Sequence, residues 1–197
     1  MNRTKWFEHI DKVCDILKNV SFKYNEGSDL TPDKGFSEWE KMAVDVFSGK
    51  NTIYMIGNGA SASMASHFAA DLAKNAGIHT EVFSDLSLIT AISNDMGYHE
   101  VFAEPLRRRG KKGDVLVLIS SSGKSSNVLN ALNVAKKLGI RTVTLSGMKP
   151  DNPLRKNGDL NIYIAGDTYG SVETAHATIL HYWMDLVEKA IKKIPSS

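Results

Sequence analysis

This sequence of 197 residues is poor in cysteine, in clustered charge and in long apolar runs, and each shortage excludes a class of protein. The single cysteine, Cys14, cannot form an intramolecular disulfide, which is typical of a reducing compartment and predicts the cytoplasm. The formal charge is only +2, and basic residues cluster no further than Arg107–Arg109 and Lys111–Lys112. We therefore expect no nucleic-acid partner. No stretch approaches the ~18 apolar residues of a membrane span, and the polar N-terminus does not resemble a secretion signal, so we expect no membrane partner.

Hydrophobic residues make up 42% of the chain, enough for a sizeable core, and the length predicts one domain over 1–197. Helical spacing of apolar residues predicts a helix over 4–23 and another over 37–47, with a break at 25–32. Beyond residue 50, β-prone runs alternate with helical segments. We predict strands over 52–56, 80–83, 114–119, 141–145 and 160–164, and helices over 61–74, 127–138 and 171–193. This alternation predicts a doubly wound α/β core over 51–197 with a five-stranded parallel sheet, preceded by a helical extension over 1–50.

Two loops stand where a strand gives way to a helix, the position at which open parallel sheets bind ligands. The first is Gly57-Asn58-Gly59-Ala60-Ser61, and the second is Ser120-Ser121-Ser122-Gly123-Lys124-Ser125. The second loop gathers four hydroxyls and several backbone N–H groups without a bulky side chain, and its glycine permits a sharp turn. Serine is also a common helix cap, so an ordinary capping turn is the alternative. Four serines in six residues favour a phosphate site.

Two nucleotide-binding motifs compete with this interpretation. Gly123-Lys124-Ser125 ends like a Walker A loop, but that motif requires a glycine where Leu118 stands, so a P-loop is excluded. Residues 57–62 fit the dinucleotide-binding pattern with alanine in the last place, and Glu81 follows at roughly the distance of the ribose-binding acid. Two features argue against dinucleotide binding: the long segment before the first strand, and the presence of a second loop suited to binding phosphate. This alternative nevertheless stays open.

The helices after these loops carry the residues suited to proton transfer. His67 and Asp71 are four positions apart and share one helix face, which suits a hydrogen bond, two metal ligands or simply a solvated surface. On the final helix His176 lies in the apolar stripe and is predicted to be a packed structural residue. His181 projects from nearly the opposite side, as a surface residue or as part of a site completed elsewhere. Glu173 suits the helix dipole.

Together these residues resemble the phosphoheptose isomerases, a family of the sugar isomerase (SIS) superfamily that acts on sedoheptulose 7-phosphate. The resemblance spans nearly the whole chain and rests on residues 57–61, 67–71, 94–95 and 119–125 and on the spacing of Glu173, His176 and His181. It implies a flavodoxin-like SIS fold, a phosphorylated sugar as partner and a homotetramer with active sites between subunits. It also implies an aldose–ketose isomerase that serves heptose synthesis for surface polysaccharide.

The resemblance also implies roles for individual residues. It implies that Asp71 and His181 transfer protons. It also implies one zinc ion per subunit, with ligands among His67, Asp71, Glu173 and His181. The residues implied in substrate binding are the phosphate-binding Ser120, Ser121, Ser122 and Ser125, the sugar-binding Asn58, Asn94 and Asp95, and Gly59, Ala60, Ser61 and Glu173.

Three positions depart from the family pattern. The family usually has glutamate at Asp71, glutamine at Glu173, and Gly-Gly-Ser where Gly59-Ala60-Ser61 stands. Aspartate is one methylene shorter, and a displacement of ~1 Å can cost on the order of a hundredfold in rate. The extra charge of Glu173 would favour a bound cation and disfavour a nearby anion.

The spacing of Glu173 and His181 limits where they can act together. Eight residues of regular helix separate them by ~12 Å, so both can bind one ion only if Glu173 lies on an unwound start or if different subunits contribute. Our main hypothesis is a phosphosugar isomerase that acts through an enediol, because a carboxylate and a histidine can supply the base and the acid. The alternative is a non-catalytic SIS protein that binds a phosphosugar or acts as an adaptor.

Overall fold

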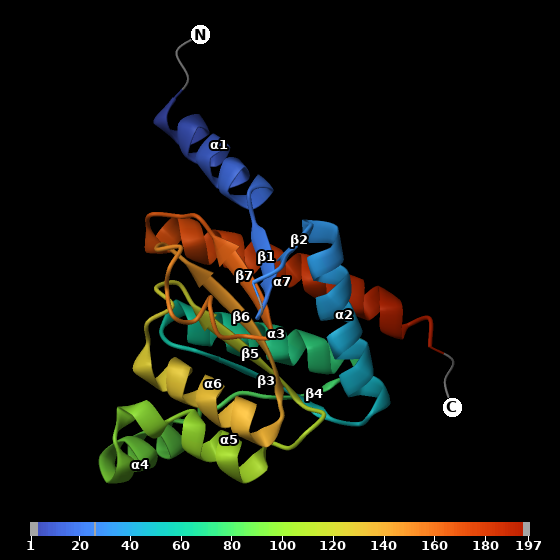
Figure 1. Ribbon diagram of the computed structural model, residues 1–197, viewed down its shortest axis with the longest axis vertical. Helices are drawn as coiled ribbons and strands as arrows, with labels where there is room; N and C mark the ends of the chain where they lie inside the picture. Colours follow the sequence, from blue (N-terminus) through green and yellow to red (C-terminus); the bar gives the residue numbers. More distant parts are fainter. Residues whose placement is uncertain (1–3, 26, 195–197) are drawn as a thin grey trace.

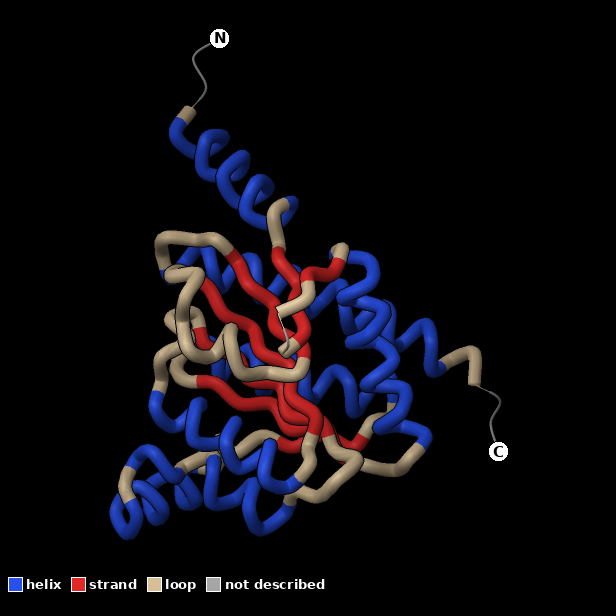
Figure 2. Tube along the Cα trace, in the orientation of Figure 1, coloured by secondary structure: helices blue, strands red, loops and turns tan. Residues whose placement is uncertain are grey.

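The computed structural model describes residues 4–25 and 27–194, which form a sheet with helices on both of its faces (Figures 1 and 2). The strands in this part of the chain are β1 (Ser21–Tyr24), β2 (Asp29–Leu30), β3 (Thr52–Gly57), β4 (His79–Glu81), β5 (Val115–Ser120), β6 (Arg141–Gly147) and β7 (Leu160–Ile164). The helices are α1 (Lys5–Lys18), α2 (Pro32–Ser48), α3 (Ala60–Ala76), α4 (Leu86–Met96), the 3-10 turn η1 (Tyr98–Glu100), α5 (Ala103–Arg109), α6 (Ser126–Leu138) and α7 (Tyr169–Ile191). No helix among the described residues is long and apolar enough to cross a membrane.

The five predicted strands form the parallel part of the sheet, in the spatial order β4-β3-β5-β6-β7. In chain order this is 2-1-3-4-5, the flavodoxin-like arrangement, so the predicted fold class is confirmed. Every residue of β3 and β5 is buried, as expected for strands covered by helices on both faces. The strand order reverses between β3 and β5, and the two predicted loops follow these two strands.

The sheet has two strands more than the five predicted, and both of them lie in the extension that was predicted to be helical. The first helix ends at Lys18, and Ser21–Tyr24 forms β1, which pairs antiparallel with β7 and with the short β2, giving seven strands. Phe22 explains the pairing, because its ring is buried against Phe36 at a centroid distance of 4.9 Å. A Cβ at Gly35 would overlap that ring, so glycine lets β1 approach α2.

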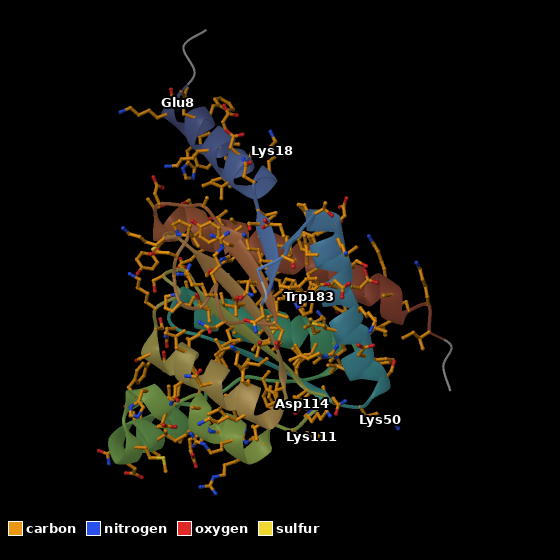
Figure 3. All side chains as sticks on the ribbon, in the orientation of Figure 1. Glu8, Lys18, Lys50, Lys111, Asp114 and Trp183 are labelled. Carbon is orange, nitrogen blue, oxygen red and sulfur yellow. The ribbon has the colours of Figure 1, made fainter. Side chains whose placement is uncertain are left out.

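Each face of the sheet has its own helical layer. The helices α2, α3 and α7 share one apolar core with the sheet, and α5 and α6 share the other. Trp39 and Trp183 stack at 4.1 Å between α2 and α7, and Figure 3 shows Trp183 inside the body of the chain. The helices α4 and α5 fall within residues 84–110, for which the sequence predicted no element.

Helix α1 projects from the body of the chain (Figure 1), and its apolar side chains remain in contact with solvent. Trp6 is 64% exposed and Phe7 58%, whereas Ile16 is the buried residue of the helix. In Figure 3 the labelled Glu8 lies in its first turn and Lys18 at its end. The amphipathic pattern therefore predicted a helix correctly, but most of its apolar face does not pack against this chain.

His176 is fully buried in α7, as its place in the apolar stripe predicted. Burial lowers the pKa of its imidazole to about 4, and a hydrogen bond with the Ser146 carbonyl at 3.3 Å only partly opposes this. The neutral ring is thus favoured in the folded state, while the unfolded chain takes up a proton near the ordinary histidine pKa of 6.5. The contribution to stability is complete above pH 6.5 and is lost as the pH falls towards 4.

Because of His176, we expect the free energy of unfolding to fall by about 2 kcal/mol between pH 7 and pH 5. The fall is about 1.4 kcal/mol for each pH unit below the pKa of the unfolded state. Urea unfolding of the wild type and of His176→Gln at both pH values measures the difference, since glutamine does not titrate. An equal loss in both proteins would show that His176 does not contribute to acid sensitivity.

Candidate functional site

The first loop is shaped by two glycines at the carboxyl end of β3. Gly57 lies beside Ile119 of β5, and a Cβ on it would come within 2.6 Å of the Ser61 Cβ, so glycine permits the close approach of strand and helix. Gly59 has a φ of 56°, which glycine adopts without strain. The turn brings Asn58 and Ser61 to the reversal point of the sheet.

The second loop leaves β5 at Ser120 and enters α6 at Ser126. The Ser120 and Ser125 hydroxyls lie 3.3 Å apart across the turn. Gly123 has a φ of 62°, and a Cβ there would overlap the buried Asn152 side chain. Two backbone hydrogen bonds hold the loop in place: Gly147 N, at the end of β6, donates to Ser121 O, and Leu154 N, in the segment after β6, donates to Gly123 O.

Both loops line one pocket of about 150 Å³. Its lining residues are Asn58, Ser61, Ile119, Ser120, Ser121, Ser122, Ser125, Tyr169 and Glu173. The Ser121 hydroxyl is buried and has no hydrogen-bond partner among the described residues. A buried polar group without a partner is rare in native proteins, and a ligand or a water molecule bound in this pocket would satisfy it. Glu173 supplies the single charged side chain of this lining.

Most of the predicted binding residues lie in or beside this pocket, but Asn94 and Asp95 do not. Gly59 and Ala60 belong to the first loop, but their side of it is exposed. Asn94 and Asp95 lie near the end of α4, exposed and hydrogen-bonded to each other, outside the lining. The sequence missed Tyr169, which lines the pocket from the first residue of α7 and carried no recognisable pattern.

The two predicted proton-transfer residues, Asp71 and His181, each lie beside His67 in a second cluster, on α3 and α7. His67 Nε2 lies 3.4 Å from Asp71 Oδ2, the contact that their spacing predicted. The His181 ring lies 5.6 Å from the His67 ring and 4.7 Å from the Phe68 ring, measured between centroids. The carboxylate and both imidazoles therefore form one group on the outer surface of these helices.

The cluster and the pocket lie at different points along α3 and α7. Helix α7 is continuous from Tyr169 to Ile191, which excludes the first of the two alternatives, an unwound start at Glu173. At 1.5 Å per residue, Glu173 and His181 are ~12 Å apart along the axis. Within one chain, the serine-lined pocket and the His–Asp cluster are therefore separate sites.

Comparison with known proteins shows which family the chain belongs to. The SIS domain family matches residues 33–147. The phosphoheptose isomerase of Helicobacter pylori strain Shi470 is 36% identical over 154 residues, which cover 75% of this chain and 80% of that protein. The phosphoheptose isomerase of Sulfurimonas denitrificans is 36% identical over 160 residues, covering 78% and 82%. The chain belongs to the phosphoheptose isomerase family.

A solved phosphoheptose isomerase from Neisseria gonorrhoeae has the same fold, with a TM-score of 0.80, 24% identity, and coverage of 93% of this chain and 97% of that one.

Membership of the phosphoheptose isomerase family argues against the alternative that the first loop binds a dinucleotide. The sheet order differs from that of dinucleotide-binding domains. Glu81, the candidate ribose-binding acid, is instead paired with Arg109 at 3.0 Å.

The residues of one chain do not fit the zinc ion that the resemblance to phosphoheptose isomerases implies. Among the described residues, no three His, Cys, Asp or Glu side chains converge in a geometry that would hold a metal ion. His67 and Asp71 meet in the outer cluster, whereas Glu173 lies in the serine pocket. A zinc site with all the implied ligands therefore does not form within a single chain.

Proposed function

We propose that the chain interconverts sedoheptulose 7-phosphate and D-glycero-D-manno-heptose 7-phosphate, in the cytoplasm, the compartment that its single cysteine favours. The observation that carries this proposal is the buried, unpartnered Ser121 hydroxyl in a pocket of serines, in a chain of the phosphoheptose isomerase family. Helix α6 begins directly after that pocket, so its N-terminal N–H groups and positive dipole end favour an anion there. A phosphate at this place leaves the sugar chain free to extend outward.

The reaction requires a base that removes the C1 proton and an acid that protonates the C2 oxygen, which gives an enediol. Protonation of C2 and loss of the C1 hydroxyl proton then complete the aldose. Asp71 and His181 supply these two groups, and His67 holds the Asp71 carboxylate from one side. Lys74 Nζ lies 4.0 Å from the other carboxylate oxygen, Asp71 Oδ1.

A complete site needs more than one copy of the chain in this proposal. The pocket residue Ser61 and the cluster residue Asp71 are ten positions apart on α3, or ~15 Å along its axis. A sugar whose phosphate sits among the serines meets a His–Asp pair more readily if that pair comes from a neighbouring subunit. The exposed position of His181 on α7 agrees with a role in such an interface, and we expect a homotetramer.

The exposed apolar face of α1 offers the surface for this assembly. Replacing Trp6 and Ile10 together by glutamate should leave the single chain folded, because both side chains are exposed, while placing charges in the interface. We expect the mass in solution to fall from a multiple of 21.6 kDa towards that value, with a parallel loss of turnover. Light scattering after gel filtration measures the mass, and Lys18→Glu is the control for added negative charge. An unchanged mass in the double variant would contradict this assembly.

In this proposal Asp71 and His181 transfer the protons without a zinc ion. A zinc ion that uses Glu173 together with His67 or His181 would need ligands from two chains of the assembly. Metal analysis of the purified oligomer, alone and after incubation with zinc, tests this directly.

The function is tested by incubating the protein with six- and seven-carbon ketose and aldose phosphates, with and without zinc. We expect conversion of sedoheptulose 7-phosphate to its aldose and no conversion of unphosphorylated sedoheptulose. Turnover of a different sugar phosphate would correct the substrate. Binding without turnover across the panel would favour a non-catalytic phosphosugar-binding or adaptor role instead.

A further inference from the structure

Three polar side chains from distant parts of the chain form a network at the edge of the pocket. Asn58 and Asn127 exchange two hydrogen bonds, with Asn58 Nδ2 donating to Asn127 Oδ1 at 3.0 Å and Asn127 Nδ2 donating to Asn58 Oδ1 at 2.9 Å. The Tyr98 hydroxyl donates to Asn58 Oδ1 at 3.1 Å. Asn127 is almost fully buried, whereas Asn58 lines the pocket. The network therefore reaches from the interior of the protein to the ligand site.

A backbone group fixes the direction of every hydrogen bond in this network. The Val128 N–H lies 3.0 Å from Asn127 Oδ1, and because an N–H can only donate, the atom facing it must be the amide oxygen. The orientation of Asn127 then sets that of Asn58 through the reciprocal pair. Tyr98 must consequently donate rather than accept. Both lone pairs of Asn58 Oδ1 are thus filled, while one Nδ2 hydrogen has no partner among the described residues.

The segment that carries Tyr98 is held firmly in place. Asn130 of α6 donates from Nδ2 to His99 O and to Glu100 Oε1, both at 3.0 Å. Arg107 of α5 pairs with Glu100 at 3.1 Å. These contacts anchor η1 to both neighbouring helices. The Tyr98 hydroxyl is therefore presented to Asn58 by a fixed turn, even though 54% of the Tyr98 surface is exposed.

We infer that Tyr98 and Asn127 are positioning residues that make Asn58 a pure hydrogen-bond donor to an oxygen of the sugar chain. With its carboxamide oxygen occupied, Asn58 can offer the ligand only its remaining N–H, which selects a carbonyl or hydroxyl oxygen that accepts. The phosphate is held separately, by the serine hydroxyls of the second loop. This inference rests on the proposed binding of a phosphosugar and adds the residues that fix how its sugar part is recognised.

The test compares two probes that share a phosphate and differ in the sugar. Inorganic phosphate reports on the serine loop alone, whereas glucitol 6-phosphate adds hydroxyls but has no carbonyl to isomerise. Calorimetry with the wild type and Tyr98→Phe should show glucitol 6-phosphate binding weakened about three- to tenfold, the size of one lost hydrogen bond, with phosphate binding unchanged. Asn58→Asp, which replaces the donor by an acceptor, should weaken the sugar phosphate further. Tyr182→Phe removes a similarly exposed hydroxyl elsewhere and should change neither affinity.

Kinetics separate this inference from the proposed function. If the wild type isomerises a phosphosugar, and Tyr98→Phe binds and isomerises it with the same affinity and rate, the inference is wrong and the proposed function stands. If the wild type binds glucitol 6-phosphate more tightly than phosphate and Tyr98→Phe removes that difference, the inference holds even without turnover. Equal weakening of both probes would mean that Tyr98 only supports the loop structure, and equal affinity of the wild type for both probes would mean that no sugar contact exists. Either result overturns the inference.

Discussion

Replacement of His181 by alanine is expected to reduce turnover of sedoheptulose 7-phosphate by at least about 100-fold, because proton transfer by a positioned side chain contributes roughly 10²–10⁴ in rate. Its imidazole is exposed and contacts the rings of Phe68 and His67, so truncation creates no core cavity. We therefore expect circular dichroism and the unfolding midpoint to remain those of the wild type. Steady-state kinetics on the purified variant measures the effect, which should fall on kcat rather than on KM.

A matched control for this variant exists at the other end of the sheet. His79→Ala also removes an exposed imidazole, but His79 begins β4 and contacts Thr52 at the start of β3, away from both loops. It should retain wild-type turnover. A His181→Ala protein that isomerises at the wild-type rate would exclude His181 from the reaction.

Removal of the Ser121 and Ser125 hydroxyls together is expected to raise KM for the sugar phosphate by about 100-fold or more. Each hydrogen bond to a charged group contributes about 1.5–3 kcal/mol, and two such losses multiply. Ser121→Ala on its own also removes a buried hydroxyl that has no partner, so this unliganded single variant should be no less stable than the wild type. Loss of phosphate affinity together with retained or increased stability distinguishes a ligand-binding role from a structural one.

Ser126→Ala is the control for the serine variants. Ser126 is the exposed first residue of α6 and lies outside the pocket lining, so its hydroxyl should not affect KM. Calorimetry with inorganic phosphate measures the same difference without turnover. If the double variant binds phosphate as tightly as the wild type, the serine pocket is not the phosphate site.

The parts of the fold that sequence predicted are those whose signals are local. The run Val115–Ile119 is apolar without interruption, as a buried parallel strand must be, and four of the next six residues are serines. By contrast, β1 depends on pairing with β7, more than 130 residues away, and its short run gives little local signal. The sequence therefore predicted the parallel sheet and the serine loop but missed the antiparallel edge.

The candidate site shows the same division between local and distant information. The His67–Asp71 contact follows from helical spacing and was one of the alternatives that the sequence left open. The Asn58–Tyr98 and Asn58–Asn127 contacts join residues 40 and 69 positions apart, and no pattern in the sequence connects them. Asn94 and Asp95 were assigned from resemblance alone, and the structure places Tyr98, a few residues later, beside Asn58 instead.

Proton exchange during isomerisation tests the central claim most directly. Sedoheptulose 7-phosphate is incubated with the protein in D₂O and followed by NMR. We predict an aldose phosphate that carries deuterium at C2, because the enediol takes up its proton from a group in exchange with solvent, and we predict no such product with His181→Ala. Recovery of the ketose phosphate unchanged, with all its carbon-bound protons and no aldose, would contradict the account.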